Sequence, residues 1–140
     1  MRATKLQTLK TNYKFEAPLV PAMMPAGLSD IADQQVRLLD LNAYLAPYPE
    51  NIFLVRVKGE SMINANIFDG DILVVDSREK PANGKIVIAS INGDMAVKYF
   101  RQNNEGISLV SANEKFSPIK IGELFEFQIQ GVVKHVIHDV

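Results

Sequence analysis

Three features of the sequence predict a mostly β fold. Short apolar runs recur from about residue 35 to the C-terminus, and turn-forming residues separate them. The dipeptide Asn92-Gly93 lies between two such runs, which strongly indicates a tight hairpin turn. Residues 125–130 alternate between apolar and polar side chains, as a half-buried strand does. We therefore expect a small barrel or sandwich of short strands.

The first 34 residues differ from the rest of the chain. They mix Thr, Asn, Lys and Pro and lack apolar periodicity, which is typical of an extended, flexible arm. Contacts between the arm and the remaining residues, 35–140, are expected only through Phe15, Leu19 and Met23 or Met24. The arm is too short for a helix-turn-helix domain, which needs several packed helices.

The elements expected next are a strand, a short helix and a second strand. Residues 35–39 alternate in part and indicate the first strand. Asp40 is a suitable N-cap for a helix over residues 41–46, which Pro47 ends. The run Ile52–Val57 has the β-branched and aromatic composition of a strand.

The remaining elements are strands joined by turns. Gly70 favours a turn over residues 68–71, and the wholly apolar run 72–75 predicts a strand buried on both faces. Residues 85–91 and 94–100 form the two arms of the Asn92-Gly93 hairpin. Further strands are expected at 106–110, 125–130 and 131–137, with a bend at Gly131.

Composition excludes several classes of function. The 140 residues carry a net charge of −1, which gives no global electrostatic reason for direct binding to nucleic acid. The absence of cysteine excludes disulfides, a thiolate nucleophile and a cysteine-rich zinc site, and it fits a reducing compartment such as the cytoplasm. No apolar run approaches the length of a membrane span.

Ser61 is the first candidate catalytic residue. The run Ile52–Val57 is followed by a break at Gly59, and Ser61 lies two residues after that break. A serine beyond a glycine bend can point outward while neighbouring backbone N–H groups stay free to face a ligand. Most serines after glycine are ordinary turn residues, so this segment alone leaves both interpretations open.

Lys98 is the second candidate. Strand alternation gives it the same face as Ala96 and Phe100, so it lies among apolar neighbours. A buried lysine without a carboxylate partner loses basicity and can act as a general base. The alternative is a lysine at a strand edge whose ammonium group reaches water, which is the commoner arrangement.

Other polar residues do not indicate a site. His135 and His138 lie near the C-terminus, and Asp139 is their only evident acidic partner, so neither a Ser-His-Asp triad nor a metal site is predicted. Three aspartates flank the apolar run 72–75 with a spacing that matches no calcium loop. We interpret these three as turn formers: Asp69, Asp71 and Asp76.

Taken together, these segments resemble the LexA-type self-cleaving serine peptidases. Gly59-Glu60-Ser61-Met62 and residues 68–76 are similar to the nucleophile segment of that family, and residues 84–89 and 96–98 to its lysine segment. Ala26-Gly27 is similar to the bond that these proteins cut in themselves. The short arm and residues 40–42, 111–113 and 116–119 resemble the UmuD-like members.

The resemblance implies a β domain of the LexA and signal-peptidase type with defined site residues. It implies that Ser61 is the nucleophile, Lys98 the general base, and Ala26-Gly27 the cleaved bond. Backbone N–H groups of Glu60 and Ser61 would bind the oxyanion. No cofactor or metal is implied.

The resemblance also implies partners in the SOS response. A RecA–single-stranded-DNA filament would stimulate cleavage. The shortened chain would form a homodimer that joins a UmuC-type polymerase subunit in error-prone translesion synthesis. Neither sequence-specific DNA binding nor a membrane is implied, and the location is the cytoplasm.

Two other functions remain open from the sequence. The chain could be a non-catalytic, dimeric interaction subunit whose arm only binds partners. It could also be a signal-peptidase-like enzyme that acts on other chains. The first alternative predicts that function survives the loss of Ser61, and the second predicts cleavage of a separate substrate.

Overall fold

Strands greatly outnumber helices in the described residues, and they pair antiparallel, which confirms the predicted mostly β fold. The computed structural model describes residues 14–22 and 36–140. These residues separate into two compact units, one made of residues 14–22 and 36–47 and the other of residues 48–140. The predicted boundary between residues 34 and 35 stays a prediction, since it lies outside the described residues. No helix in the described ranges has the length and apolar character that crossing a bilayer requires.

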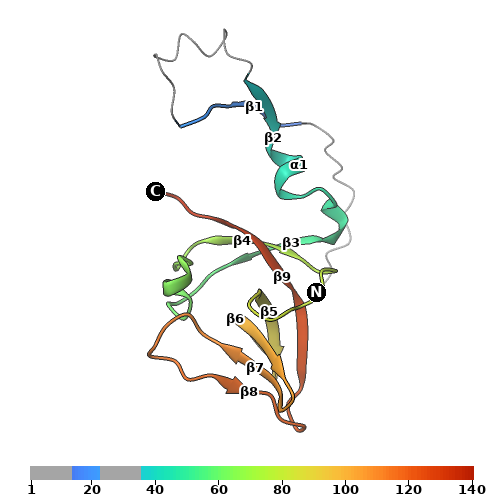
Figure 1. Ribbon diagram of the computed structural model, residues 1–140, viewed down its shortest axis with the longest axis vertical. Helices are drawn as coiled ribbons and strands as arrows, with labels where there is room; N and C mark the ends of the chain where they lie inside the picture. Colours follow the sequence, from blue (N-terminus) through green and yellow to red (C-terminus); the bar gives the residue numbers. More distant parts are fainter. Residues whose placement is uncertain (1–13, 23–35) are drawn as a thin grey trace. The chain divides into compact units, whose positions relative to one another are not determined.

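The first unit is a two-stranded ribbon followed by a short helix (Figure 1). Strand β1 (Glu16–Leu19) pairs with β2 (Arg37–Asp40), with Pro18 opposite Leu38. Asp40 then caps helix α1 (Leu41–Leu45), because its carboxylate accepts hydrogen bonds from the backbone N–H groups of Asn42 and Ala43. The predicted strand and capped helix are confirmed, whereas β1 is an additional strand.

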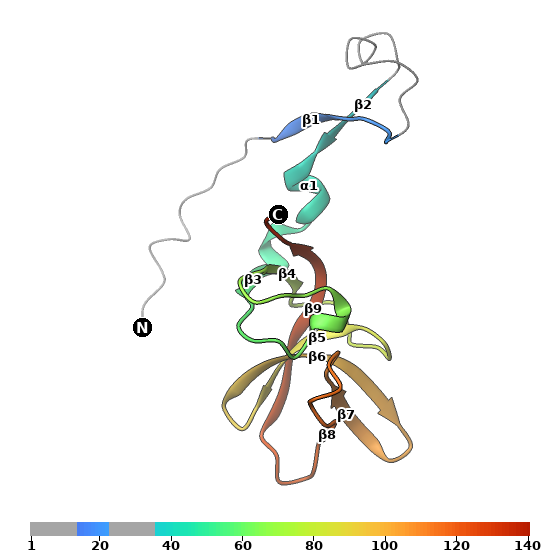
Figure 2. The same cartoon turned by 90° about the vertical axis from the view of Figure 1, so that its left-hand side faces the viewer.

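The second unit holds a single seven-stranded antiparallel sheet (Figure 1; Figure 2). Short 3₁₀ helices at Pro49–Asn51 and Ile63–Ala65 precede and follow its first strand. Its strand order is β3-β4-β9-β5-β6-β7-β8. The strands are β3 (Ile52–Arg56), β4 (Ile72–Asp76), β5 (Ile86–Ile91), β6 (Asp94–Asn103), β7 (Gly106–Val110), β8 (Ile119–Lys120) and β9 (Phe127–Ile137).

The hairpin between β5 and β6 follows the sequence prediction. Asn92 and Gly93 form its turn with φ angles of 51° and 91°. A two-residue turn with positive φ at both positions suits the right-handed twist of the flanking strands. The register that this turn sets places Val87 opposite Lys98.

Both faces of the central strands are buried. Leu73, Val75 and Ile88 belong to one hydrophobic cluster, whereas Val87 and Ala89 belong to a second cluster across the sheet. Full burial of each such aliphatic side chain contributes about 1.5–3 kcal/mol. Because β4 and β5 are covered on both sides, side chains of neighbouring strands that pack against them are also shielded from water. Val97 and Phe100 of β6 are examples.

Strand β9 joins the two halves of the sheet at Gly131. Its later residues pair with β4 and its earlier residues with β5, and register shifts interrupt both ladders. A Cβ atom on Gly131 would lie 2.7 Å from the Asp76 carbonyl oxygen and 2.7 Å from Val75 Cγ1. The predicted bend at this glycine is therefore a close approach between the backbones of β9 and β4.

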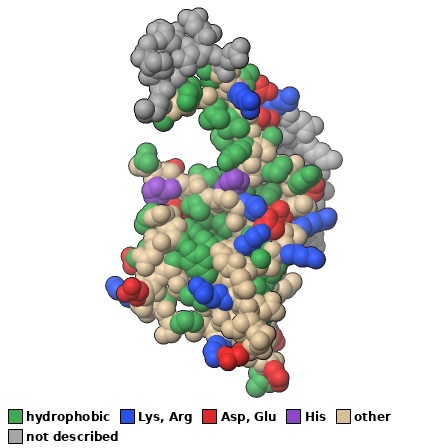
Figure 3. Space-filling model, viewed as in Figure 1, with side chains coloured by type: hydrophobic (Ala, Val, Ile, Leu, Met, Phe, Trp, Pro, Cys, Tyr) green, Lys and Arg blue, Asp and Glu red, His purple; other side chains and the backbone are tan. Residues whose placement is uncertain are grey.

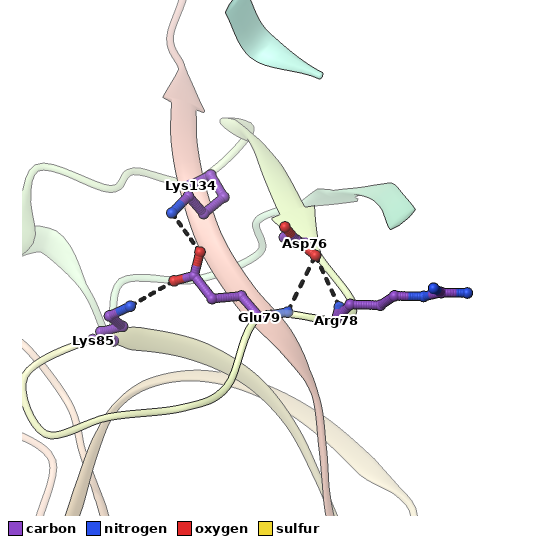
Figure 4. A network of polar contacts seen from close by, with 5 residues as sticks. All are labelled: Asp76, Arg78, Glu79, Lys85 and Lys134. Atoms are coloured by element: carbon purple, nitrogen blue, oxygen red, sulfur yellow. Dashed lines mark hydrogen bonds and ion pairs between the residues drawn. The ribbon is translucent and has the colours of Figure 1, made fainter. Parts of the chain in front are cut away.

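A cluster of charges fastens the loop between β4 and β5 to the sheet (Figure 4). The Glu79 carboxylate receives hydrogen bonds from Lys134 Nζ on β9 at 2.5 Å and from Lys85 Nζ at 2.7 Å. These two lysines hold the pKa of Glu79 below its usual value. Asp76 accepts from the backbone N–H groups of Arg78 and Glu79, so it forms a turn as predicted.

Gly131→Ala should destabilise the second unit. The new methyl group meets backbone and a buried valine, neither of which can move freely, so we expect a loss of about 1–3 kcal/mol of unfolding free energy. The matched control is Gly122→Ala, whose Cβ would lie 3.6 Å from the Phe125 ring in ordinary contact. Urea denaturation measures both variants, and equal stability of the two would contradict the close approach at Gly131.

Candidate active site

Ser61 lies on a bent loop between β3 and the 3₁₀ helix Ile63–Ala65. The bend is made at Gly59, whose φ of +93° is a backbone conformation that other residues rarely adopt. Met62, with 2% of its surface exposed, anchors the residue after Ser61 in the core, while Ser61 itself is half-buried. The local sequence thus leaves the serine hydroxyl near the surface on an anchored backbone.

The turn at residues 68–71 supports this loop from one side. The Asp69 carboxylate accepts a 2.7 Å hydrogen bond from the Gly59 N–H, and the Val57 backbone exchanges two 2.8 Å bonds with Gly70 and Asp71. The side chain of Asp71 accepts from the Phe68 N–H at 2.8 Å. Asp69 and Asp71 are therefore turn formers, as predicted, and Asp69 also holds the glycine bend before Ser61.

Lys98 is buried in the middle of β6. Its exposed fraction is 8%, and its ammonium nitrogen donates a 2.5 Å hydrogen bond to Ser111 Oγ. The Phe116 ring lies 5.4 Å from Nζ, and no carboxylate pairs with it among the described residues. Burial lowers the pKa of Lys98 below its usual value of 10.5 because the charged form loses hydration. The predicted apolar surroundings of this lysine are confirmed.

One cavity brings Ser61 and Lys98 together. It has a volume of about 420 Å³ and is lined by residues 55–62 and 95–98, with Ile88 and Phe116. Figure 3 shows hydrophobic side chains gathered in the middle of the second unit. The Ser61 hydroxyl and the Lys98 amine thus line the same cleft, and among the described contacts the amine donates its hydrogen bond to Ser111 and not to Ser61.

The Glu60-Ser61 peptide has a fixed orientation. Its carbonyl oxygen accepts hydrogen bonds from Asn113 Nδ2 at 2.9 Å and from the Ile63 N–H at 3.3 Å. Carbonyl and N–H point in opposite directions across a trans peptide, so the Ser61 N–H points away from Asn113. Within the described residues, the N–H groups of Glu60 and Ser61 donate to no protein acceptor. Both remain available for an anionic oxygen.

The predicted cleavage bond and the two histidines are the remaining residues that the sequence analysis considered. Ala26 and Gly27 lie outside the described residues, so the position of that bond stays a prediction. The expectation that His138 has no acidic partner besides Asp139 is wrong, because its Nδ1 lies 2.6 Å from the Asp71 carboxylate. The hydrogen bond from the Phe68 N–H and, after it, this contact with His138 lower the pKa of Asp71. Neither histidine lines the cavity.

Sequence reasoning did not assign Ser111 or Asn113 to the site. Both follow β7, about fifty residues after the Ser61 loop, and reach it only through the fold of the sheet. Their segment appeared in the sequence as a point of family resemblance without a role. Isolated polar residues of this kind carry no spacing signal, so only the three-dimensional arrangement identifies them.

Comparisons with known proteins identify a family and several relatives of this chain. The family described as Peptidase S24-like matches residues 18–134. The protein named ImpA from Salmonella typhimurium is 40% identical over 118 residues, which cover 84% of this chain and 77% of ImpA. The protein named SamA from Salmonella typhimurium is 42% identical over 123 residues, or 87% of this chain and 85% of SamA.

A third relative is longer than this chain. The LexA repressor of Xylella fastidiosa is 35% identical over 113 residues, which cover 81% of this chain but 52% of the repressor. The aligned portion is therefore the part that the two proteins share, and about half of the repressor has no counterpart in the alignment.

Proposed function

The chain belongs to the peptidase S24-like family, and from this membership we propose that it is a serine peptidase that cuts its own polypeptide between Ala26 and Gly27. Members of the family are serine peptidases, and the relatives named LexA repressor support a self-cleaving protein of the SOS type. The resemblance to LexA-type peptidases is thus confirmed for the family as a whole.

The observation that carries the proposal is the shared cavity of Ser61 and Lys98. Ser61 is held beyond the Gly59 bend, and Lys98 is buried without a carboxylate partner in the described part of the chain. A lysine whose pKa is lowered by burial supplies a neutral amine at a higher fraction than an exposed lysine does. Such an amine can accept the serine proton. No histidine is among the described residues that line the cavity.

The reaction follows from these positions. Neutral Lys98 takes the proton from Ser61 Oγ while the oxygen attacks the carbonyl carbon of Ala26, and the N–H groups of Glu60 and Ser61 bind the resulting oxyanion. Protonated Lys98 gives its proton to the Gly27 nitrogen as the C–N bond breaks. Water then attacks the ester on Ser61: Lys98 accepts a proton from the water and returns it to Ser61 Oγ as the ester bond breaks.

The tether between substrate and site explains why a simple dyad suffices. Because Ala26 belongs to the same chain as Ser61, its effective concentration at the cavity is high when a chain cuts itself. The rate is scaled by the fraction of time that the cleavage segment occupies the cavity. A partner that favours the docked conformation therefore accelerates cleavage without adding a catalytic group.

We infer the partners from the same family membership. A RecA–single-stranded-DNA filament would be the partner that favours docking. The shortened chain would act in the cytoplasm as a homodimer with a UmuC-type polymerase subunit in error-prone translesion synthesis. The relatives named ImpA and SamA, which align over most of their own length, support the UmuD-like assignment.

Ser61→Ala and Lys98→Ala should each abolish self-cleavage. Removing the nucleophile or its base should lower the rate by about 10³-fold or more. Matched controls are Ser117→Ala and Lys120→Ala, which alter an exposed serine and an exposed lysine away from the cavity. Gel analysis with activated RecA follows the loss of full-length chain. Continued processing of either dyad variant rules out the dyad, and full biological function of Ser61→Ala would favour a non-catalytic interaction subunit.

Spontaneous cleavage should accelerate as pH rises. Only neutral Lys98 accepts the serine proton, so the rate should increase about tenfold per pH unit below the folded pKa of Lys98 and level off above it. Burial lowers that pKa, so the midpoint should lie below 10.5. The measurement is the first-order rate of purified full-length chain across this range. A flat profile between about pH 6 and pH 10 would contradict the lysine-base mechanism.

The larger product should begin with the residues Gly27-Leu28-Ser29-Asp30. N-terminal sequencing, or the intact mass of the product, reads this directly. A different first residue moves the cleaved bond but leaves the dyad untouched. Mixing an inactive Ser61→Ala chain with a chain altered at Ala26 would show whether one copy cuts another.

A further inference from the structure

The segment Ser111–Asn113 touches both halves of the proposed dyad. It begins directly after β7, whose last residue, Val110, lies opposite Tyr99 on β6. Ser111 contacts Lys98, and Asn113 contacts the peptide that precedes Ser61. These contacts join two loops and a strand that are far apart in the sequence.

Ser111 is the hydrogen-bond partner of the Lys98 amine. The Nζ–Oγ distance is 2.5 Å, and the only other described contact of the amine is the Phe116 ring. The charged side chains of the cavity lining are Arg56, Lys58 and Glu60, and none forms an ion pair with Lys98. A neutral amine that donates one N–H to Ser111 has its lone pair restricted in direction. The hydrogen bond to Ser111 therefore orients the lone pair of Lys98 Nζ.

Asn113 has the corresponding position for the oxyanion donors. Its side-chain nitrogen Nδ2 donates to the Glu60 carbonyl, and its side-chain oxygen Oδ1 accepts from the Lys115 N–H at 3.0 Å. The side chain is buried, with 8% exposed, so the amide has a single well-supported orientation. By holding the Glu60 carbonyl, Asn113 makes the Ser61 N–H point in the opposite direction within the peptide plane.

Ala112, between Ser111 and Asn113, attaches the segment to the residues that follow Ser61. Its backbone N–H donates to Met62 Sδ at 3.3 Å, and its carbonyl oxygen accepts from the Asn64 N–H at 2.8 Å. Ala112 and Met62 are both buried in the same hydrophobic cluster. The segment therefore cannot shift relative to the Ser61 loop without breaking backbone contacts on both sides.

We propose that Ser111 and Asn113 are positioning residues of the peptidase site: Ser111 aims the Lys98 amine, and Asn113 aims the Ser61 N–H toward the oxyanion. This proposal rests on the proposed self-cleavage by Ser61 and Lys98. Ser111 contacts the Lys98 amine and Asn113 contacts the Glu60 carbonyl, but neither side chain takes a proton from Ser61 or forms a bond in the proposed reaction. Ser111 acts through the base, whereas Asn113 acts through the backbone donor, so their loss should have different kinetic signatures.

The first test measures the pKa of Lys98 without using activity. The full-length Ser61→Ala chain, which cannot cleave, is labelled with ¹³C-lysine and titrated by NMR. A hydrogen bond to the charged amine is stronger than one to the neutral amine, so adding Ser111→Ala should lower the Lys98 pKa by about one pH unit. Ser111→Thr keeps the hydroxyl and should restore the original value. An unchanged or raised pKa in Ser111→Ala overturns the proposal.

The second test measures the pH–rate profile of self-cleavage. Ser111→Ala should lower the plateau rate about tenfold and move the midpoint to lower pH, because it alters both the aim and the basicity of Lys98. Asn113→Ala should lower the plateau about tenfold or more with an unmoved midpoint, since it affects only the oxyanion donor. Ser117→Ala, in the same loop but exposed, should match the wild-type profile.

Thermal unfolding of each variant separates positioning from loss of structure. If Asn113→Ala unfolds, Asn113→Asp keeps the acceptor for Lys115 while removing the donor to Glu60, and its plateau should still fall. A wild-type plateau in folded Asn113 variants overturns the proposal. Failure of the wild-type chain to cleave at all overturns the proposed function instead, and the Lys98 titration still decides whether Ser111 controls the amine.

Discussion

Burial of Lys98 without a carboxylate partner is the constraint on which the site depends. A lysine at the middle of a strand normally reaches water or an acid, because a buried ammonium group is costly. Here the strand lies between β5 and β7, and Lys98 lines a cavity whose other lining residues are mostly apolar. The cost is reduced by a single hydrogen bond to Ser111, and burial lowers the pKa of the Lys98 amine. The packing of the sheet thus determines the chemistry of the amine.

The Ser61 loop is held by a different kind of interaction. Its backbone is supported by Asp69 at the Gly59 N–H and by Asn113 at the Glu60 carbonyl, while Met62 is anchored in the core. The Gly59 N–H and the Glu60 carbonyl are therefore hydrogen-bonded. The N–H groups of Glu60 and Ser61 have no protein acceptor among the described residues. Rigid support combined with free donors is what transition-state stabilisation requires.

Local sequence signals predicted the parts of the fold that local interactions determine. Asn92-Gly93 specifies a turn by its own dihedral preferences, and Asp40 caps the helix within its first turn. Strands β1 and β8 escaped prediction because they are short and obtain their order from a partner strand. The contact of His138 with Asp71 was also missed, since it joins residues 67 positions apart through the pairing of β9 with β4.

The same distinction applies to the site. Ser61 and Lys98 were identified because a glycine bend and an apolar strand face leave traces in sequence, and the family resemblance then joined them. Ser111 and Asn113 leave no such trace, since each forms its contact only after β7 has brought the segment beside β6. A dyad with a tethered substrate needs no strong base, but it does need accurate aim. The residues that provide that aim are therefore found in the folded structure and not in the motif.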